Sequence, residues 1–447
     1  MMEVLQYAKL SHWGARQPQS KPSRTGQYDR YALGELLHRV MEPVIIEDSL
    51  IYTRLTIKTE GAGAEVRKKR GLPEQIAGKD IGRKNQFVVR EGQMVVSSID
   101  ARNGAVGIVP AEADGCVVTD NFWVFKVEES LVIPRFLQQI VARPSVREKI
   151  LEKSHGTTNR QYITLDDFLK VNVPIPDMKI QREVLAKLKK LDGRVQKLQE
   201  EVDGFAAERN TIIDKHLGGL PTSSTVKGRL MSLEYQDLQK WSFCNRLNVS
   251  SGRRSVKLRE CITNFMEQDG ASLRIMPMVI PNKAFRYIGM DAVEKDTGLL
   301  IEENIKTKGA EIRSASLRVP YGYAIYGKLR PYLNKMWKND TVGTTTICSS
   351  EFIVFKTSDL LDARYFLAIL GSSYIQSQIE RKMSGARMPR LSPSDFLNLE
   401  VPHPEDTIQK AIGEAVEALR QETVKKKNSI KRLTGTQKEK VFNSYDL

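Results

Sequence analysis

Residues 167–176 read DFLKVNVPIP, and residues 395–404 read DFLNLEVPHP. Six of the ten positions are identical, whereas unrelated stretches agree at about one position in twenty. The segment NFWVFK at residues 121–126 comes back in the same way as EFIVFK at residues 351–356. The chain is therefore a tandem pseudo-repeat.

The repeat defines the domain organisation. Solenoid and propeller units run about 20 to 50 residues, and this period is far longer, so each copy is a domain. We predict an α+β fold in which two mixed lobes are separated by two long antiparallel coiled-coil helices. The predicted lobes are residues 1–178 and 231–404, the helical arms are residues 179–217 and 405–447, and residues 218–230 are a linker.

Short β-rich runs dominate both lobes. β-branched and aromatic content between glycine-containing turns predicts strands at residues 86–89, 94–99, 107–109 and 122–127, and again at 316–319, 323–326 and 352–355. Apolar residues three or four apart predict a helix in each lobe, at residues 135–152 and 363–381.

The arms begin after paired prolines. Asp177 and Asp406 stand where a helix N-cap is expected, and Gly218-Gly219 ends the first arm. That helix would have about 40 residues and a length of roughly 60 Å.

Each arm carries an apolar seam of the coiled-coil type. In the first arm the seam is Val184, Leu188, Leu191, Val195, Leu198, Val202, Phe205 and Ile212, with Arg209 as a polar interruption. In the second it is Ile408, Ile412, Val416, Leu419, Ile430 and Leu433, with Thr423 and Lys426 on the seam. The seams predict that the arms pair with each other; the alternative is that each arm packs on its own lobe.

Composition favours a polyanionic partner. Sixty-nine Lys and Arg against 54 Asp and Glu leave a formal charge of +15, which points to nucleic acid ahead of a membrane surface. No long apolar run or secretory leader is apparent, so we expect a cytoplasmic protein. The four cysteines, Cys116, Cys244, Cys261 and Cys348, are far apart, which favours buried thiols over a zinc site or disulfides.

Catalytic motifs are not found in the sequence. It contains no Walker loop, no His-Glu-x-x-His helix and no Asp/Asn-Pro-Pro-aromatic motif of amino methyltransferases. We therefore expect a binding protein that holds no cofactor or metal.

Basic clusters are the positive signal, since several cations on one surface neutralise phosphates. Lobe one carries Arg67, Lys68, Lys69, Arg70, Lys79, Arg83 and Lys84, and lobe two carries Lys306, Lys308, Arg313, Arg318 and the segment GKLRPYLNK at residues 327–335. A glycine turn followed by arginine also recurs, at residues 156–160 and 385–390. Arginine can bind phosphate or guanine, but it can equally anchor a turn to a carboxylate, and a single cluster can be a solvated face.

Several segments resemble the specificity subunit of type I restriction-modification systems. In lobe two they are YIGM at residues 287–290, GKLRPYLNK at 327–335, CSSEFIV at 348–354 and SGARMPR at 384–390; VPIP at residues 173–176, followed by Gln181 and a long helix, adds to them. In lobe one, SSIDARNG at residues 97–104 replaces the GKLRPY pattern.

The resemblance implies a DNA-reading subunit with two target recognition domains, each reading one half of a split target in double-stranded DNA. It also implies partners: two copies of a DNA adenine methyltransferase and a restriction-translocase subunit, which would bring S-adenosylmethionine, ATP and Mg. A type IIB specificity subunit and a protein adaptor with duplicated lobes are the alternatives, and a self-contained nuclease is the least favoured.

Two sets of site residues follow as hypotheses. The expected DNA contacts are Lys68, Lys69, Arg70, Lys84, Lys328, Arg330 and Lys335 to phosphates, and Arg102, Asn103, Arg160, Arg387 and Arg390 in the grooves. The expected arm interface is Leu188, Leu191, Val195, Leu198, Val202, Phe205, Ile412, Val416, Leu419 and Ile430.

Overall fold

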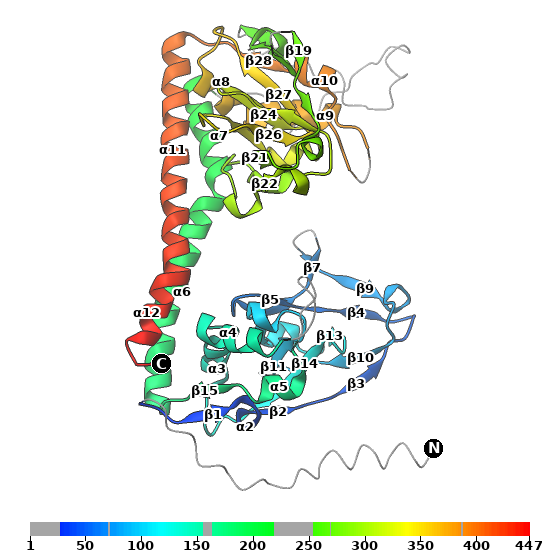
Figure 1. Ribbon diagram of the computed structural model, residues 1–447, viewed down its shortest axis with the longest axis vertical. Helices are drawn as coiled ribbons and strands as arrows, with labels where there is room; N and C mark the ends of the chain where they lie inside the picture. Colours follow the sequence, from blue (N-terminus) through cyan, green and yellow to red (C-terminus); the bar gives the residue numbers. More distant parts are fainter. Residues whose placement is uncertain (1–26, 70–71, 155–162, 219–253, 269, 386–387) are drawn as a thin grey trace. The chain divides into compact units, whose positions relative to one another are not determined.

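The computed structural model describes residues 27–69, 72–154, 163–218, 254–268, 270–385 and 388–447 of the chain. It divides into two compact units: unit one is Met1–Val195 with Arg432–Leu447, and unit two is Gln196–Lys431. Each unit holds one lobe and parts of the long helices (Figure 1). Both lobes contain helices and strands, so the predicted mixed fold class is confirmed.

An antiparallel sheet in the order β12-β11-β14-β2 forms the centre of lobe one. Its strands are β2 (Leu37–Arg39), β11 (Met94–Ser97), β12 (Val106–Ile108) and β14 (Phe122–Val127). The helices α3 (Pro134–Val141) and α4 (Pro144–Glu152) pack on it, because Val96, Phe125, Phe136 and Ile150 share one buried cluster.

Smaller sheets of two or three strands complete the lobe. They are β13-β10-β3 (Val117–Val118, Asn85–Val88 and Pro43–Ile45), β4-β9 (Ile51–Thr53 and Gln75–Ala77), β5-β6 (Leu55–Lys58 and Gly63–Val66), β7-β8 (Lys68–Lys69 and Leu72–Pro73) and β1-β15 (Arg30–Ala32 and Asn172–Pro174).

Lobe two has a corresponding sheet in the order β17-β27-β24-β25. Its strands are β17 (Ile262–Thr263), β24 (Tyr323–Gly327), β25 (Met336–Lys338) and β27 (Phe352–Thr357), and its helices are α8 (Ala363–Leu370) and α9 (Ser373–Lys382). A second sheet contains β20 (Arg274–Ile275), β23 (Ser316–Arg318), β26 (Thr346–Ser349), β21 (Ala284–Ile288) and β22 (Lys306–Lys308), in that order. Two short pairs, β16-β28 (Ser255–Lys257 and Glu400–Pro402) and β18-β19 (Glu267–Gln268 and Ala271–Ser272), complete the lobe.

Strand pairing repeats between the lobes. Met94 pairs with Phe125 in lobe one, and Ala324 pairs with Phe355 in lobe two. The positions that matched in the sequence repeat therefore occupy matching positions in the two sheets.

The repeated Asp-Phe-Leu motif forms a short capped helix in each lobe, α5 (Leu165–Leu169) and α10 (Pro393–Leu397). Thr164 and Ser392 are the N-caps, and each accepts a hydrogen bond from the backbone N–H of the motif aspartate. The motif phenylalanines, Phe168 and Phe396, are fully buried in the lobe cores.

The repeated glutamine joins each lobe to the helix that follows it. Gln181 accepts from the backbone N–H of Ile133 at 2.8 Å and donates to the carbonyl of Pro176 at 2.9 Å. Gln409 accepts from the N–H of Asp362 at 2.9 Å and donates to the carbonyl of Pro404 at 2.9 Å. Both amides are buried, so these junctions are built in the same way.

The single helices predicted at residues 135–152 and 363–381 are each two helices. In lobe one Pro144 begins α4, and Arg143 before it has an extended backbone, as a residue before proline prefers. In lobe two Ser372 caps α9 after the short connection at Gly371.

The long helices are α6 (Met178–Asp203), α7 (Phe205–Leu217) and α11 (Asp406–Arg432), followed by a π-helical turn (Leu433–Gln437) and α12 (Lys438–Asn443). Asp177 caps α6 through its Oδ1, which accepts from the N–H groups of Lys179 and Ile180. The predicted cap at Asp406 was wrong by one residue, since the N–H of Gln409 bonds to the carbonyl of Glu405. Gly218 ends α7 with a left-handed φ of 62°, as predicted.

In unit one the C-terminal segment packs on lobe one and on α6. Phe442 lies in the same buried cluster as Val184 and Leu188. The hydroxyl of Tyr445 donates to Glu183 at 3.3 Å, and the Lys187 ammonium lies 4.4 Å from the Tyr445 ring centroid.

In unit two the N-terminal part of α11 and α7 pack on lobe two. Ile213, Leu217, Ile412 and Val416 belong to the lobe-two core. Lys426 on α11 forms a 3.0 Å ion pair with Glu201 on α6. In unit two, Ile412 and Val416 thus contact the lobe that precedes their helix, whereas α7 contacts the lobe that follows it.

The polar seam positions have structural roles. Arg209 and Thr423 are buried, and the Thr423 hydroxyl donates to the carbonyl of Leu419 within its own helix. Among the described residues, no helix has the length and apolarity needed to span a membrane.

Candidate nucleic-acid interface

Three segments of lobe two that are distant in sequence meet at one turn. The backbone N–H of Lys328 donates to the carbonyl of Glu351 at 2.9 Å, and the carbonyl of Lys328 accepts from the N–H of Leu391 at 2.9 Å. The N–H of Arg330 donates to the carbonyl of Pro389 at 2.8 Å. The segments at 327–335, 348–354 and 388–391 therefore form one surface feature, which we call the lobe-two turn.

An ion pair holds this turn together. The Arg390 guanidinium donates to both carboxylate oxygens of Glu351, at 3.2 and 3.1 Å, and this carboxylate raises the pKa of Arg390. Arg390 was a predicted groove contact, but its guanidinium anchors the turn, which was the alternative role considered for it.

Exposed side chains remain at the tip of the lobe-two turn. Arg330 is exposed, and its backbone is left-handed at φ 48°. Tyr332 is 43% exposed and Met388 is 55% exposed. A cation beside an aromatic and a flexible apolar side chain can contact phosphate and bases together.

Lys335 has an internal partner. Its ammonium donates to the carbonyl of Met290 at 2.6 Å, and burial lowers the pKa of Lys335. Lys328 is half-buried. Among Lys328, Arg330 and Lys335, Arg330 is thus the one best placed to meet a ligand.

Lobe one shares one contact of this turn among the described residues, with different side chains. The N–H of Ser98 donates to the carbonyl of Asn121 at 2.9 Å, as Lys328 does to Glu351. Arg102 and Asn103 lie in the 3₁₀-helix Ala101–Asn103. In the repeat, Arg102 corresponds to Tyr332 of lobe two. Asn103 donates to Asp100 Oδ1 at 3.0 Å, and both Arg102 and Asn103 are half-buried.

The predicted lobe-one cations differ in their exposure and in their hydrogen-bond and ion-pair partners. Lys68 and Lys69 form β7 and are exposed, and no ion pair to them occurs among the described residues. Lys84 instead donates to the carbonyl of Gly78 at 2.7 Å and pairs with Asp48. Arg70, Arg160 and Arg387 lie outside the described residues.

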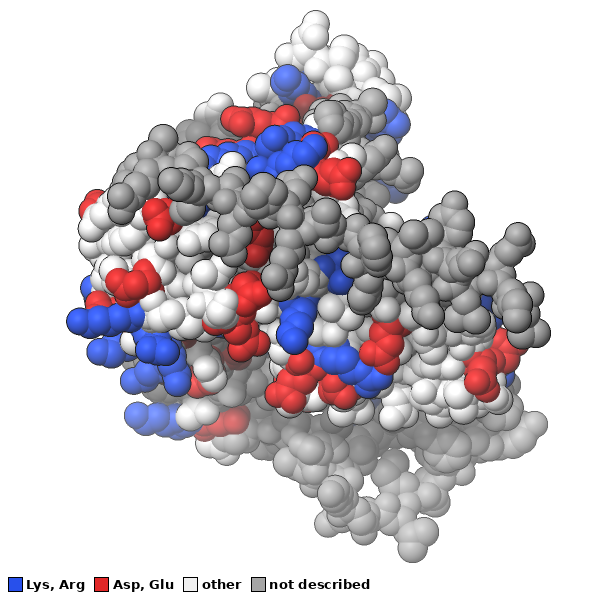
Figure 2. Space-filling model, turned by 90° about the horizontal axis from the view of Figure 1, so that it is seen from below, with Lys and Arg blue, Asp and Glu red and all other residues white. Residues whose placement is uncertain are grey.

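Carboxylates stand beside many of the surface cations. On the face in Figure 2, blue and red side chains are interspersed over the described surface. The pairs Arg83–Asp120, Arg90–Glu42 and Lys257–Glu400 are examples. Net charge alone therefore overstates how many cations are ready to bind phosphate.

The described residues were also searched for metal-ligand groups and free thiols. The described residues contain no group of three or more His, Cys, Asp or Glu side chains able to hold a metal. Cys116, Cys261 and Cys348 are buried free thiols, and burial raises the pKa of each. Cys244 lies outside the described residues.

Sequence reasoning missed Tyr332 and Glu351 as members of the site. Tyr332 was present in the GKLRPYLNK segment, and its place opposite Arg102 in the repeat was the available signal. Nothing local marks Glu351 as the partner of Arg390, because the two are 39 residues apart.

Comparison with known proteins finds similarity to one family. Residues 50–202 match the family described as type I restriction modification DNA specificity domain. The chain is also 27% identical over 120 residues to the type I restriction enzyme HindI specificity subunit of Haemophilus influenzae. That alignment spans 26% of each chain, so the matched part is about a quarter of the relative's length.

Solved structures of low identity resemble the chain over nearly its full length. The HsdS subunit from Thermoanaerobacter tengcongensis is 14% identical, with a TM-score of 0.37 over 97% of this chain and 98% of that one. The type I S subunit from M. genitalium is 16% identical, with a TM-score of 0.42 over 95% and 97%.

Proposed function

We propose that this chain, which belongs to the type I restriction-modification specificity family, is the non-catalytic DNA-recognition subunit of such a complex. The match of residues 50–202 to the DNA specificity domain carries the proposal. The repetition of the lobe-one strand pairing in lobe two supports a second reader on the same chain. The target would then be bipartite, with one half read by each lobe.

In this proposal residues 1–178 and 231–404 are the target recognition domains, and residues 218–230 link the first arm to the second domain. The arms, residues 179–217 and 405–447, pair as an antiparallel coiled coil, and their length sets the gap between the half-sites. Contacts within each unit support the pairing: Tyr445 with Glu183 in unit one, and Lys426 with Glu201 in unit two.

The partners follow from the family. We propose that the chain binds double-stranded DNA, two copies of a DNA adenine methyltransferase and a restriction-translocase subunit, in the cytoplasm. S-adenosylmethionine, ATP and Mg belong to those partners, and the methyltransferase flips its target base.

DNA contacts divide into two proposed sets. Phosphate contacts come from Lys68, Lys69, Arg70, Lys84, Lys328, Arg330 and Lys335. Groove contacts come from Arg102, Asn103, Arg160 and Arg387, to which we add Tyr332. Arg390 would first have to leave its ion pair with Glu351 to reach a groove. Lys84 and Lys335 must each give up an internal hydrogen bond to reach a phosphate. We therefore expect a smaller loss of DNA affinity from their removal than from removal of Arg330.

Methylation mapping tests the proposal. Genomic DNA is sequenced for modified adenine from cells that express the chain with its methyltransferase, and from cells with the methyltransferase alone. The expected result is methylation at a split motif with a constant gap, only when this chain is present. Methylation that does not depend on the chain, or that lacks a sequence motif, would refute the function.

A further inference from the structure

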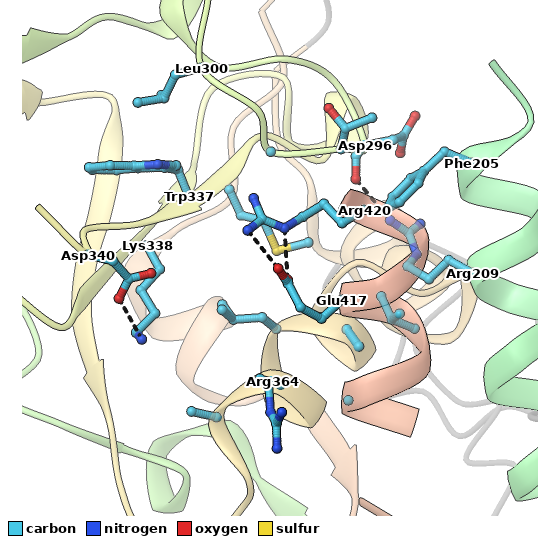
Figure 3. A pocket seen from close by; sticks show the side chains of 18 of the residues that line it. Phe205, Arg209, Asp296, Leu300, Trp337, Lys338, Asp340, Arg364, Glu417 and Arg420 are labelled. Atoms are coloured by element: carbon cyan, nitrogen blue, oxygen red, sulfur yellow. Dashed lines mark hydrogen bonds and ion pairs between the residues drawn. The ribbon is translucent and has the colours of Figure 1, made fainter. Parts of the chain in front are cut away.

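Unit two encloses a cavity of about 540 Å³ that plays no part in the proposed DNA contacts (Figure 3). Its lining comes from α7, α8, α11, β25 and the loop around Asp296. Small-molecule sites in proteins have volumes of about 300–1,000 Å³. The cavity is therefore large enough for a compact ligand.

Most cations that line the cavity are neutralised by a neighbouring carboxylate. The pairs are Arg420–Glu417, Lys338–Asp340, Arg364–Glu414 and Arg286–Glu302. These groups need no ligand to balance their charge.

Arg209 is different. It is only 3% exposed, and its Nη1 donates to the backbone carbonyl of Asp296 at 3.1 Å, while its Nε is buried without a hydrogen-bond partner. No carboxylate lies within ion-pair distance of it among the described residues. Burial lowers the pKa of Arg209 to about 10, which is still high enough to keep the guanidinium charged at neutral pH.

The Asp296 carboxylate attracts Arg209 and favours its charged form, but it lies beyond ion-pair distance. The desolvation of this buried cation is therefore only partly offset. The buried Arg143 of unit one shows the usual solution, since it forms a 2.9 Å ion pair with Glu439. The guanidinium of Arg209 instead lies 5.7 Å from the Phe205 ring centroid. An anion in the cavity would give the Arg209 guanidinium a hydrogen-bond acceptor and a negative charge at ion-pair distance.

The remaining lining is suited to an apolar body. In Figure 3, Arg209 and Trp337 lie on opposite sides of the view, with the Arg420–Glu417 pair between them. Leu367 and Val416 also line the cavity. An occupant with one anionic end and one apolar end would match both sides.

We propose that this cavity binds a carboxylate attached to a compact apolar group, with the carboxylate on the Arg209 guanidinium and the apolar group against Trp337 and Leu367. Two sources share this chemistry: a free organic acid, and a carboxylate presented by a protein partner of the complex. The site is independent of DNA recognition.

Thermal unfolding of the full chain tests the site, with benzoate as the probe and benzamide as its neutral isostere. Benzoate at tenfold over its Kd should raise Tm by about 2–4 °C, and benzamide should raise it by less than half as much. Arg209→Met should abolish the benzoate shift. Because this substitution removes an unpaired buried charge, the variant without ligand should be at least as stable as the parent.

Two further variants serve as controls. Arg209→Lys keeps a cation and should retain part of the benzoate shift even if Arg209→Met folds poorly. Arg364→Gln removes a cavity cation that already has Glu414 as its partner, and it should leave the shift unchanged. Equal shifts with benzoate and benzamide, an undiminished shift in Arg209→Met, or no shift in the isolated parent chain would overturn the proposal.

The same measurement on the assembled complex separates the two sources. A benzoate shift in both the isolated chain and the complex identifies a free organic acid as the ligand. A shift in the isolated chain that disappears in the complex identifies a partner's carboxylate as the occupant.

Discussion

Arg330 combines a left-handed backbone with an exposed side chain that we propose contacts DNA phosphate. Its φ of 48° is unfavourable for a side chain with a Cβ by about 1–2 kcal/mol, and the residue is exposed at the tip of the lobe-two turn. Strain retained at an exposed position indicates a functional side chain. The fold gains nothing evident from the guanidinium itself.

The substitution Arg330→Gly separates the effect of backbone strain on stability from the effect of the guanidinium on DNA binding. The free energy of unfolding should stay the same or rise by up to about 1 kcal/mol, because glycine adopts this backbone without strain. The complex with the methyltransferase should bind target DNA more weakly, and its salt slope should fall by about 0.9. Denaturant unfolding and a salt titration of DNA binding provide the two readouts.

Arg330→Lys is the matched control, since it keeps the charge and the strain. It should leave the salt slope near that of the parent. A slope that falls equally in both variants, or that changes in neither, would remove Arg330 from the phosphate contacts.

At the scale of elements, the C-terminal helix α12 stands out because it belongs to lobe one. Phe442 is fully buried in the lobe-one core, and Arg143 pairs with Glu439 and lies 4.7 Å from the Phe442 ring centroid. The end of the chain thus completes a core formed by its beginning.

Phe442→Ala should therefore destabilise lobe one by about 3–5 kcal/mol, as expected for a large core side chain. Lys440→Ala, on an exposed position of the same helix, should change stability by less than about 0.5 kcal/mol. Limited proteolysis followed by mass spectrometry reports which part unfolds. Equal effects of the two variants would contradict the packing described for α12.

Gly204 separates α6 from α7 but has a right-handed backbone, with φ −70° and ψ −10°. A Cβ there would lie no closer than 3.4 Å to its neighbours, which is ordinary contact. Gly204→Ala should raise the free energy of unfolding by about 0.5–1 kcal/mol, measured by denaturant titration. A loss of stability would show that the break at Gly204 is required by the fold.

Local signals in the sequence predicted elements well and contacts less well. The strand at residues 122–127 and the end at Gly218 were predicted because β-branched and aromatic content and glycine chemistry act over a few residues. The breaks at Arg143 and Gly371 were missed because the apolar pattern continues through them. The partner of Arg390 and the lobe-one position of Phe442 were not predictable, since both depend on contacts between distant segments.

At the scale of the molecule, duplication explains why one chain would read two half-sites. Each lobe presents the same turn, formed by Ser98 with Asn121 in lobe one and by Lys328 with Glu351 in lobe two. The side chains on it differ: lobe one has the half-buried Arg102, and lobe two has the exposed Tyr332. Two different half-sites require corresponding turns that carry different side chains.

Methylation mapping of two single-lobe variants, Arg102→Ala and Tyr332→Ala, each expressed with the methyltransferase, tests this central claim most directly. Tyr332→Ala should relax or rewrite one half of the split motif and leave the other half and the gap unchanged. Arg102→Ala should do the same to the opposite half. If either variant altered both halves together, or if the parent motif were continuous, the two lobes would not be independent readers and the account would be contradicted.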